Sequence, residues 1–369
     1  MEREEKLNTT QAKQNDMLNL CKGIACILVV VNHFHHAGIA GQIEYTISHL
    51  GVPLFFLISG YFLYRDVPEE IELRLPKKIA HSLKLTLWHL FLYITVGLIA
   101  VCVFEQINIE SIGVFLSEIF TLKAISKTIV FSATLYGGGQ WFLWALLEAY
   151  IIVWLFFKLK KCKLFYNYGL KLAVCLFVIH IFIRPIFILC GLGEVGLIDL
   201  RETYVVRNVY FDAIPFILVG FSIHMRKNQY LQSVDSGKKI SSQHYLKVAV
   251  FWGLISIIES FAVSAIVPSM NCVLYVGTII SEVALFEFCI VHPTVNGILG
   301  KMIAKYGQGC SMITYFIHPI VGGAVERLNV TETVFPAVVI AVTIIFSALI
   351  CECWNLVKTR ILEIGQKKQ

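Results

Sequence analysis

The chain has 369 residues, of which 57% are hydrophobic and 15% charged, and its mean hydropathy is +0.72. Soluble domains carry about a quarter charged residues and do not have enough interior to bury so much apolar surface. The composition therefore excludes a soluble protein and indicates a single polytopic membrane domain.

The predicted elements are about ten apolar helices, each long enough to cross a bilayer. We expect an all-α membrane domain over residues 17–354, between a cytoplasmic N-terminal tail (1–16) and a cytoplasmic C-terminal tail (355–369). A helix at 111–131, in the longest outer loop, is predicted to lie at the membrane interface because it carries three charged residues. The expected spans are 17–37, 45–64, 85–104, 141–157, 172–192, 204–224, 246–267, 273–291, 311–325 and 334–354.

The basic residues are distributed unevenly between the two sides of this arrangement. With the N-terminus inside, the cytoplasmic segments hold 25 of the 31 Lys and Arg residues, and the outer segments hold four. This is the distribution that the positive-inside rule describes, and it predicts that both termini are cytoplasmic. The net charge of +6 is then explained by topology, and no nucleic-acid partner is expected.

The cysteines and histidines do not predict a metal site. Most of the 11 cysteines lie in the expected spans, and none has the spacing with another Cys or His that zinc sites use. His33, His35 and His36 do not converge on one face of a helix. We interpret His35 and His36 as interfacial residues, and we expect no metal.

The first expected span carries a lysine and a histidine on one face. Lys22 and His33 are eleven positions apart, which on a helix is about 20° beyond three full turns and roughly 16 Å along the axis. With the N-terminus inside, Lys22 is near the cytoplasmic surface and His33 is in the outer half of the bilayer. One interpretation is a face that binds a long ligand with an anionic head. The other, given equal weight, is that Lys22 snorkels and His33 caps an interface.

Other ionisable groups reach a similar depth from different helices. Tyr315 and His318 share one helical stripe, and His318 is about 10 Å from the inner end of its span. Arg207 and Asp212 enter from the outer side, and Arg184 lies in the outer half of the preceding span. These groups are therefore candidates for one site near the middle of the membrane.

Charged side chains inside a membrane are costly, so each is a functional candidate by default. The alternative is that they form buried polar contacts that hold helices together. We favour that alternative, or a position at the interface, for Glu148, Glu259, Glu282 and Glu287, because no spacing connects them with chemistry.

Four stretches carry a more specific signal: KGIACILVVVNHF at 22–34, GVPLFFLISGYFL at 51–63, GQWFLWALLEAYII at 139–152 and SMITYFIHPIV at 311–321. Together and in this order they resemble the signatures of the membrane-bound acyltransferase 3 family, the polytopic O-acyltransferases of bacterial envelopes. RNVYFDAIPFILVGF, at 207–221, is similar to the corresponding span of Gram-positive members. The resemblance extends from about residue 17 to residue 354, almost the whole chain.

This resemblance implies a multi-pass enzyme of the bacterial plasma membrane. Such enzymes transfer an acyl group, usually acetyl from acetyl-CoA, to a sugar or other extracytoplasmic acceptor. The family's first-span motif is an arginine, ten residues, and an essential histidine; here Lys22 stands in the place of the arginine and His33 is the histidine. The nearest match to the family's CoA-associated Arg-x-x-Arg pair is Arg74-Leu75-Pro76-Lys77, followed by Lys78.

The reaction expected from this resemblance begins with CoA entering from the cytoplasm. Its phosphates are expected to meet Lys22, Arg74, Lys77 and Lys78, and its arm to follow the first-span face to His33, the general base or acyl carrier.

The outer residues are expected to serve the acceptor and the transition state. Arg207 or Arg184 is expected to stabilise the oxyanion. His318 and Tyr315 are expected to orient the acceptor, with Asp212 in the same binding site.

A different class of protein, a secondary transporter or a membrane sensor module, is the alternative. Ten spans with buried ionisable residues also suit proton-coupled transport. Transporters usually show paired halves with matching broken helices, and the sequence shows no such duplication. The enzyme is therefore the favoured prediction.

Overall fold

The structure, a computed structural model, describes residues 15–104, 109–137, 139–196, 198–235, 242–267 and 274–366. The predicted N-terminal tail, 1–16, thus lies almost entirely outside the described residues, as does part of the predicted cytoplasmic loop 225–247. The elements are α2 (Asp16–His33), α3 (Gly38–Ser48), α4 (Gly51–Leu63), α5 (Pro68–Phe104), α6 (Ile109–Ile119), α7 (Leu122–Phe131), α8 (Trp141–Lys158), α9 (Cys162–Leu189), β1 (Glu194–Val195), β2 (Ile198–Asp199), the 3₁₀ turn η1 (Thr203–Val205), the π-helical turn η2 (Val209–Ala213), α10 (Ile214–Asp235), α11 (Ser242–Ile266), α12 (Val276–Val291), α13 (Ile298–Gly309), α14 (Ser311–Glu326) and α15 (Phe335–Gln366).

The prediction of a helical membrane domain is confirmed in its main feature: apart from the two-residue strands β1 and β2, which pair antiparallel, the regular structure of the described residues is helical. Within the described residues, eight helical stretches are long and apolar enough to cross a membrane, as judged by length and composition. The predicted spans 273–291 and 311–325 are not among the eight, because they form helices α12 and α14 of only 16 residues each. The number of ten spans therefore stays a prediction.

Several helices are longer than the spans predicted for them. Helix α9 begins at Cys162 rather than at residue 172. Helix α5 begins at Pro68 rather than at residue 85. Its charged first turns resemble a loop in sequence, but Ile71 and Leu75, one helical turn apart, are fully buried and hold this part of the helix against the protein. Helix α15 continues to Gln366 and so includes most of the predicted C-terminal tail.

The predicted interfacial helix at 111–131 is two helices, α6 and α7. The chain breaks at Thr121, which has extended backbone angles and whose hydroxyl accepts a hydrogen bond from the amide of Ala124. This is N-cap geometry, and it starts a new helix where the sequence pattern continues without interruption.

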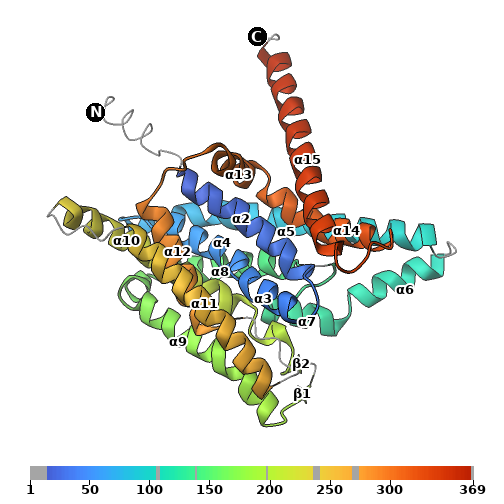
Figure 1. The fold of residues 1–369 in the computed structure, drawn as a ribbon, viewed down its shortest axis with the longest axis horizontal. Coiled ribbons are helices and arrows are strands. Elements are labelled where there is room, and N and C mark those ends of the chain that lie inside the picture. The colour runs from blue at the N-terminus through green and yellow to red at the C-terminus, as the bar shows by residue number, and fades with distance from the viewer. Residues whose placement is uncertain are drawn as a thin grey trace.

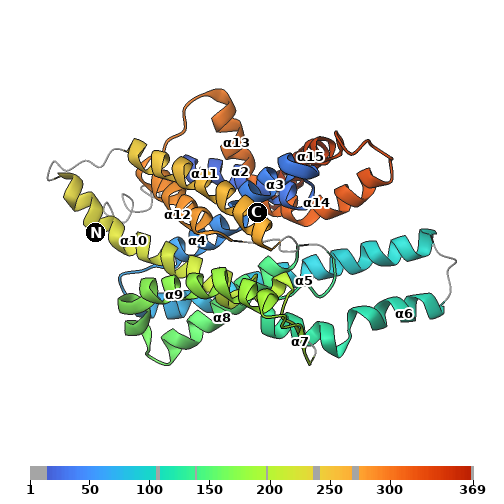
Figure 2. The same ribbon diagram turned by 60° about the horizontal axis from the view of Figure 1, so that its bottom comes forward.

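The helices form two sides around α4. Helices α8 and α9 lie on one side, and α11, α12 and α13 lie on the other (Figure 2). Helix α2 packs against α13, α4, α3 and α14, which brings the first and last thirds of the chain together. Helices α5 and α6 extend together away from the rest in Figure 2, and α15 projects from the body in Figure 1.

Helices α4 and α10 cross in close contact in the core. A Cβ atom on Gly60 would lie 2.0 Å from the carbonyl oxygen of Ile217, and a Cβ atom on Gly220 would lie 2.1 Å from that of Leu57. The two glycines thus allow the two backbones to touch on both sides of the crossing, as small residues do in membrane helix pairs. Phe56, next to this crossing, is fully buried.

We expect Gly220→Ala to lower the free energy of unfolding by roughly 1–3 kcal/mol. The new methyl group would overlap with backbone atoms of α4, which cannot move aside as a flexible side chain could. The thermal melting temperature of the purified protein in detergent measures this. Gly323→Ala is the matched control, since the space around Gly323 is open, and it should leave the melting temperature unchanged or slightly higher. Equal melting temperatures for the two variants would contradict the close crossing.

Candidate functional site

Two histidines from opposite ends of the sequence meet at the end of α2. His33 is the last residue of α2, and its ring centroid lies 5.0 Å from that of His318 on α14. His33 is exposed, whereas His318 is completely buried. The pair therefore has one imidazole that a substrate can reach and one that the protein encloses.

The hydrogen bonding of His318 fixes its tautomer. Its Nδ1 atom lies 3.2 Å from the carbonyl oxygen of Thr314, and since a carbonyl only accepts, Nδ1 carries the proton and donates. In the neutral ring, Nε2 is then the unprotonated nitrogen. This buried atom has no hydrogen-bond partner among the described residues, so it is available to accept one.

A glycine backs both rings. A Cβ atom on Gly139 would lie 3.8 Å from Nε2 of His33 and 3.7 Å from Cε1 of His318. Gly139 has a φ of +79°, in the left-handed region that favours glycine. The hydroxyl of Tyr315 donates to the Gly139 carbonyl, which connects α14 to the loop before α8. A backbone segment without a side chain is thus held beside the two imidazoles.

A guanidinium completes the group from a third direction. Arg207 lies over the ring of Trp141, 4.6 Å from its centroid, and donates to the side-chain oxygen of Asn32 at 3.4 Å. Asn32 precedes His33, and Arg207 is among the charged neighbours of His33. The side chain of Asn208 caps the π-helical turn η2 by accepting from the amides of Tyr210 and Phe211. That cap fixes the backbone directly after Arg207.

A small pocket lies next to this group. It leaves about 20 Å³ in which the centre of a water molecule can lie, which is room for roughly one water. Asp212 is 3% exposed in its wall, and its Oδ1 atom is 3.6 Å from Nδ1 of the buried His180. The pocket is lined by Asn32, Ser48, His49, Val52, Pro53, Trp141, Arg207, Asp212 and Leu274.

Comparison with known proteins assigns the family. A family model described as an acyltransferase domain, of the acyltransferase 3 type, matches residues 15–352. The chain belongs to the acyltransferase 3 family. No curated protein and no solved structure matches the chain. Membership implies a membrane acyltransferase, and the apolar helices make it a multi-pass membrane protein.

The structure brings together four of the predicted site residues around His33. His318, Tyr315, Arg207 and Asp212 all lie at this site or in the wall of its pocket. Arg184 is placed differently: its Nε atom donates to the carbonyl oxygen of Arg201 at 2.5 Å. Its electrostatic neighbour His180 lies beside Asp212, which connects it to the wall of the pocket.

The predicted phosphate-binding cations lie on two separate helices. Lys78 sits over the ring of Tyr150, 5.5 Å from its centroid, and Arg74 is 3.8 Å from the carboxylate of Glu70. Lys77, on the same helix, is exposed. Lys22 is half-buried on α2, next to the contact between Gly23 and Ile303 of α13. No contact between Lys22 and the α5 cations is found in the described part of the chain.

Two of the glutamates interpreted as structural contacts have such contacts. Glu148 accepts from the hydroxyl of Ser132 at 2.5 Å, and Glu259 accepts from the amide of Gly277 at 2.8 Å. Glu282 is completely buried, and neither carboxylate oxygen has a hydrogen-bond partner among the described residues. The described residues contain no group of three or more His, Cys, Asp or Glu that could hold a metal ion.

Sequence reasoning missed Trp141, Gly139, Asn32 and His49 as site residues. The first three lie inside the quoted motifs GQWFLWALLEAYII and KGIACILVVVNHF, so the motifs were the available signal. Periodicity did not reveal them, because Gly139 acts through its backbone and Trp141 through the face of its ring. His49 is in no quoted motif and enters the site only because α3 folds back against α2.

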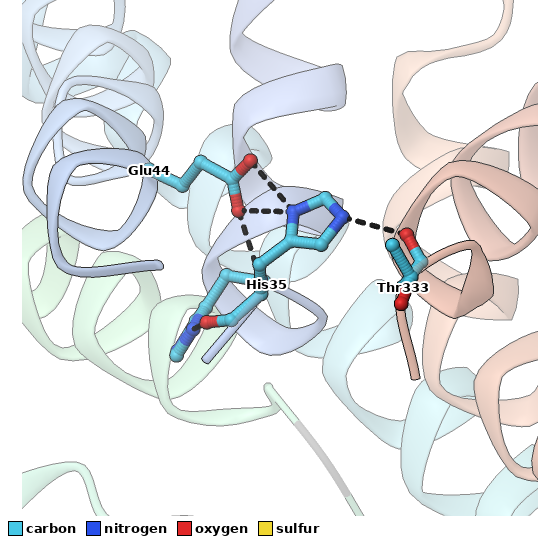
Figure 3. Close-up of polar contacts among 4 residues, drawn as sticks. His35, Glu44 and Thr333 are labelled. Atoms are coloured by element: carbon cyan, nitrogen blue, oxygen red, sulfur yellow. Dashed lines mark hydrogen bonds and ion pairs between the residues drawn. The ribbon is translucent and has the colours of Figure 1, made fainter. Parts of the chain in front are cut away.

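The side chain of His36, in the connection after α2, forms polar contacts with two other segments. We call these contacts of His36 with Glu44 and Thr333 the latch. Nδ1 of His36 lies 2.8 Å from a carboxylate oxygen of Glu44 on α3, and its Nε2 lies 3.0 Å from the carbonyl oxygen of Thr333. Figure 3 shows Glu44 and Thr333, and its dashed lines from these two residues are the contacts with His36. Because both partners only accept, both ring nitrogens donate in the charged form of His36. The latch lies three residues beyond His33. It joins the α2–α3 connection to the segment before α15.

We expect the stability that this latch contributes to fall as the pH rises. The side-chain hydrogen bond with Glu44, together with the Thr333 carbonyl, raises the pKa of His36 above its usual 6.5. The contribution is therefore fully present below about pH 6.5 and is lost as the pH rises through the higher pKa of the folded protein. Melting temperatures at pH 6.0 and pH 8.5 measure it: the difference between the two should be smaller in His36→Gln than in the wild-type protein. His244→Gln, at an exposed position on α11, is the control. An unchanged difference in His36→Gln would show that the latch does not titrate in this range.

Proposed function

We propose that the protein transfers an acyl group, in the simplest case acetyl from acetyl-CoA, to a hydroxyl group of an envelope glycan or similar extracytoplasmic acceptor. The single observation that carries this proposal is an exposed imidazole, His33, held 5.0 Å from a buried second imidazole and beside a guanidinium. Acyl transfer to a hydroxyl needs a base and a stabiliser of the oxyanion, and this group supplies both.

The proposed step uses His33 as the general base. His33 takes the proton of the acceptor hydroxyl, and the oxygen attacks the carbonyl carbon of the thioester. The carbon–sulfur bond then breaks, and the protonated His33 returns the proton to the CoA thiolate. No net proton is gained or lost, so one imidazole serves the whole turnover.

Arg207 is proposed to stabilise the oxyanion of the tetrahedral intermediate. Its guanidinium is held by the Trp141 ring and by Asn32, so it does not have to reorganise when charge develops. Arg184, bonded to the carbonyl of Arg201, is assigned to the support of this region through His180.

The acceptor is proposed to place only its reacting hydroxyl beside His33, next to the pocket that has room for about one water molecule. The wall of this pocket offers a carboxylate in Asp212, an amide in Asn32 and a hydroxyl in Ser48, which are the groups that bind sugar hydroxyls. His318, whose ring lies next to that of His33, is proposed to orient the acceptor hydroxyl, and Tyr315 to hold the loop at Gly139 as well.

The donor is proposed to bind by its phosphates at the basic ends of α2 and α5. Lys22, Arg74, Lys77 and Lys78 supply the positive charge, and a cation contact with phosphate is stronger than a neutral hydrogen bond. Lysine at position 22 keeps the charge of the family arginine without its bidentate geometry.

The decisive experiment follows labelled acetyl-CoA in membranes that contain or lack the protein. CoA release together with label in an envelope fraction, both dependent on the protein, supports the proposal. Uptake of a solute coupled to protons without any CoA release would instead support the alternative, a secondary transporter.

We expect His33→Ala to reduce acyl transfer by roughly 10²- to 10⁴-fold, the usual contribution of general acid–base catalysis, at a normal level of inserted protein. His35→Ala is the matched control, because His35 is exposed and its Nδ1 atom lies 3.0 Å from the carbonyl oxygen of the adjacent His36. It should retain most activity. A loss of less than about tenfold in His33→Ala would be too small for a general base.

We further propose that both termini lie in the cytoplasm of a bacterial cell, with the β1–β2 region outside, on the strength of the distribution of basic residues. In a cysteine-free background, a membrane-impermeant maleimide added to intact cells should label Val195→Cys and leave Leu159→Cys unlabelled. Both side chains are exposed, 62% and 67% respectively. Labelling of Leu159→Cys alone would reverse the orientation and the side from which CoA enters.

A further inference from the structure

Helix α5 carries a buried polar stripe that the proposed mechanism does not use. Counted from Lys78, the positions of Ser82, Thr86, His89 and Tyr93 fall within about 80° of one another around the helix axis. Ser82 is 3% exposed, Thr86 and His89 are 0% exposed, and Tyr93 is 6% exposed. On the other side of the helix, Leu83, Leu87 and Trp88 are exposed. The stripe is thus the face that α5 turns toward the protein.

The polar atoms of this stripe are incompletely paired. Neither ring nitrogen of His89 nor the hydroxyl of Ser82 has a hydrogen-bond partner among the described residues. An unpaired buried polar group costs free energy of the order of 1–3 kcal/mol, and the cost recurs at both positions. Groups of this kind are retained where something else, such as a ligand, supplies the missing partner.

The stripe begins and ends at parts of the proposed site. At one end Lys78, a proposed phosphate contact, lies over Tyr150. At the other end the His89 ring lies 5.6 Å from the ring of Tyr315 and 5.0 Å from that of Phe316, and Tyr93 donates to the Phe316 carbonyl at 3.1 Å. Since Tyr315 contacts His318, the stripe connects a cation with the histidine pair.

Helices α2 and α5 both carry a lysine and a histidine at the same spacing, but only on α5 is the face between the two residues polar. Lys78 and His89 are eleven positions apart, as are Lys22 and His33, which corresponds to roughly 16 Å along each helix. Between Lys22 and His33 the same face carries Cys26 and Val29, which are buried and apolar. A polar arm that passes through the membrane finds hydrogen-bonding groups along α5 and not along α2.

We propose that the stripe Lys78–Ser82–Thr86–His89 is the track that binds the pantetheine arm of the acyl-CoA donor. The proposal rests on the proposed function, in which an acyl-CoA is the donor. Pantetheine is a linear chain with two amide groups, each with one donor and one acceptor. A neutral imidazole also offers one donor and one acceptor, so His89 matches an amide, and Ser82 offers a hydroxyl. With the phosphates at Lys78, the arm leads the thioester toward Tyr315 and His33.

The test measures binding and therefore does not need the acceptor. Purified protein is titrated with two probes: acetyl-CoA, which has the arm, and adenosine 3′,5′-bisphosphate, which has phosphates but no arm. His89→Leu should weaken acetyl-CoA binding about tenfold, the effect of losing one well-made hydrogen bond, and leave the bisphosphate affinity unchanged. His81→Leu, at an exposed position on the same helix, should bind both probes like the wild-type protein.

The outcomes separate this inference from the proposed function. If the wild-type protein binds neither probe, the CoA donor itself is wrong. If the wild-type protein and His89→Leu bind acetyl-CoA equally well, acetyl-CoA remains the proposed donor but the α5 track is overturned. The polar groups of the stripe would then serve to bind water or to pack the helix. If His89→Leu loses both probes through misfolding, the smaller change Ser82→Ala decides: weaker acetyl-CoA binding at unchanged bisphosphate affinity supports the track, and unchanged binding of both overturns it.

Discussion

The contact between the His33 and His318 rings is the interaction on which the site depends. It requires α2 and α14, which are nearly 300 residues apart in sequence, to place their side chains 5.0 Å apart. Gly139 lies beside both rings, and the Tyr315 hydroxyl donates to its carbonyl. A side chain at position 139 is opposed by the left-handed backbone, whereas its Cβ atom would be in ordinary van der Waals contact with the two imidazoles. The loop beside the two histidines is therefore held by a backbone contact at a residue whose φ favours glycine.

The rest of the fold supports this arrangement through close helix packing. In a membrane, helices gain little from apolar burial, because lipid is as apolar as a leucine side chain, and their association relies on close contact and hydrogen bonds. The glycines at the α4–α10 crossing provide the first. Asn32, which contacts both Ser48 on α3 and Arg207, provides the second at the site itself. The His36 latch then joins the end of α2 to the segment before α15.

Several buried polar atoms in the described residues have no hydrogen-bond partner, and some of them lie along the α5 stripe and at the histidine pair. Ser82 and His89 on α5, Gln140 and Trp144 at the start of α8, and His318 on α14 all carry such atoms in the described part of the chain. Each is costly in isolation, particularly in a membrane. Glu282 and Thr278 on α12 show that the pattern is not confined to the site. What distinguishes the α5 group is its order along one face, from a cation to the histidine pair.

The sequence by itself determined the class of the protein. Its composition required a membrane, the apolar segments predicted most helices, and four motifs predicted the family that the match over residues 15–352 confirmed. It also predicted the grouping of His33, His318, Tyr315 and Arg207, because polar residues at matching depths in a membrane have few other places to go. The sequence did not predict the start of α5 at Pro68 or the break at Thr121, since both depend on local burial and capping rather than on hydropathy.

Only the tertiary structure decided which polar groups share a site. Helical periodicity relates residues on one helix, but it carries no information on how two helices face each other. Arg184 and Arg207 were therefore equivalent in sequence, and packing turned the first toward the Arg201 carbonyl and the second toward Trp141 and Asn32. The equal spacing of Lys22–His33 and Lys78–His89 was likewise visible in the printed sequence. The packing of α5 against α8 and α14 decides the rest: it buries His89 completely, leaves its ring nitrogens without a hydrogen-bond partner among the described residues and places it beside Tyr315.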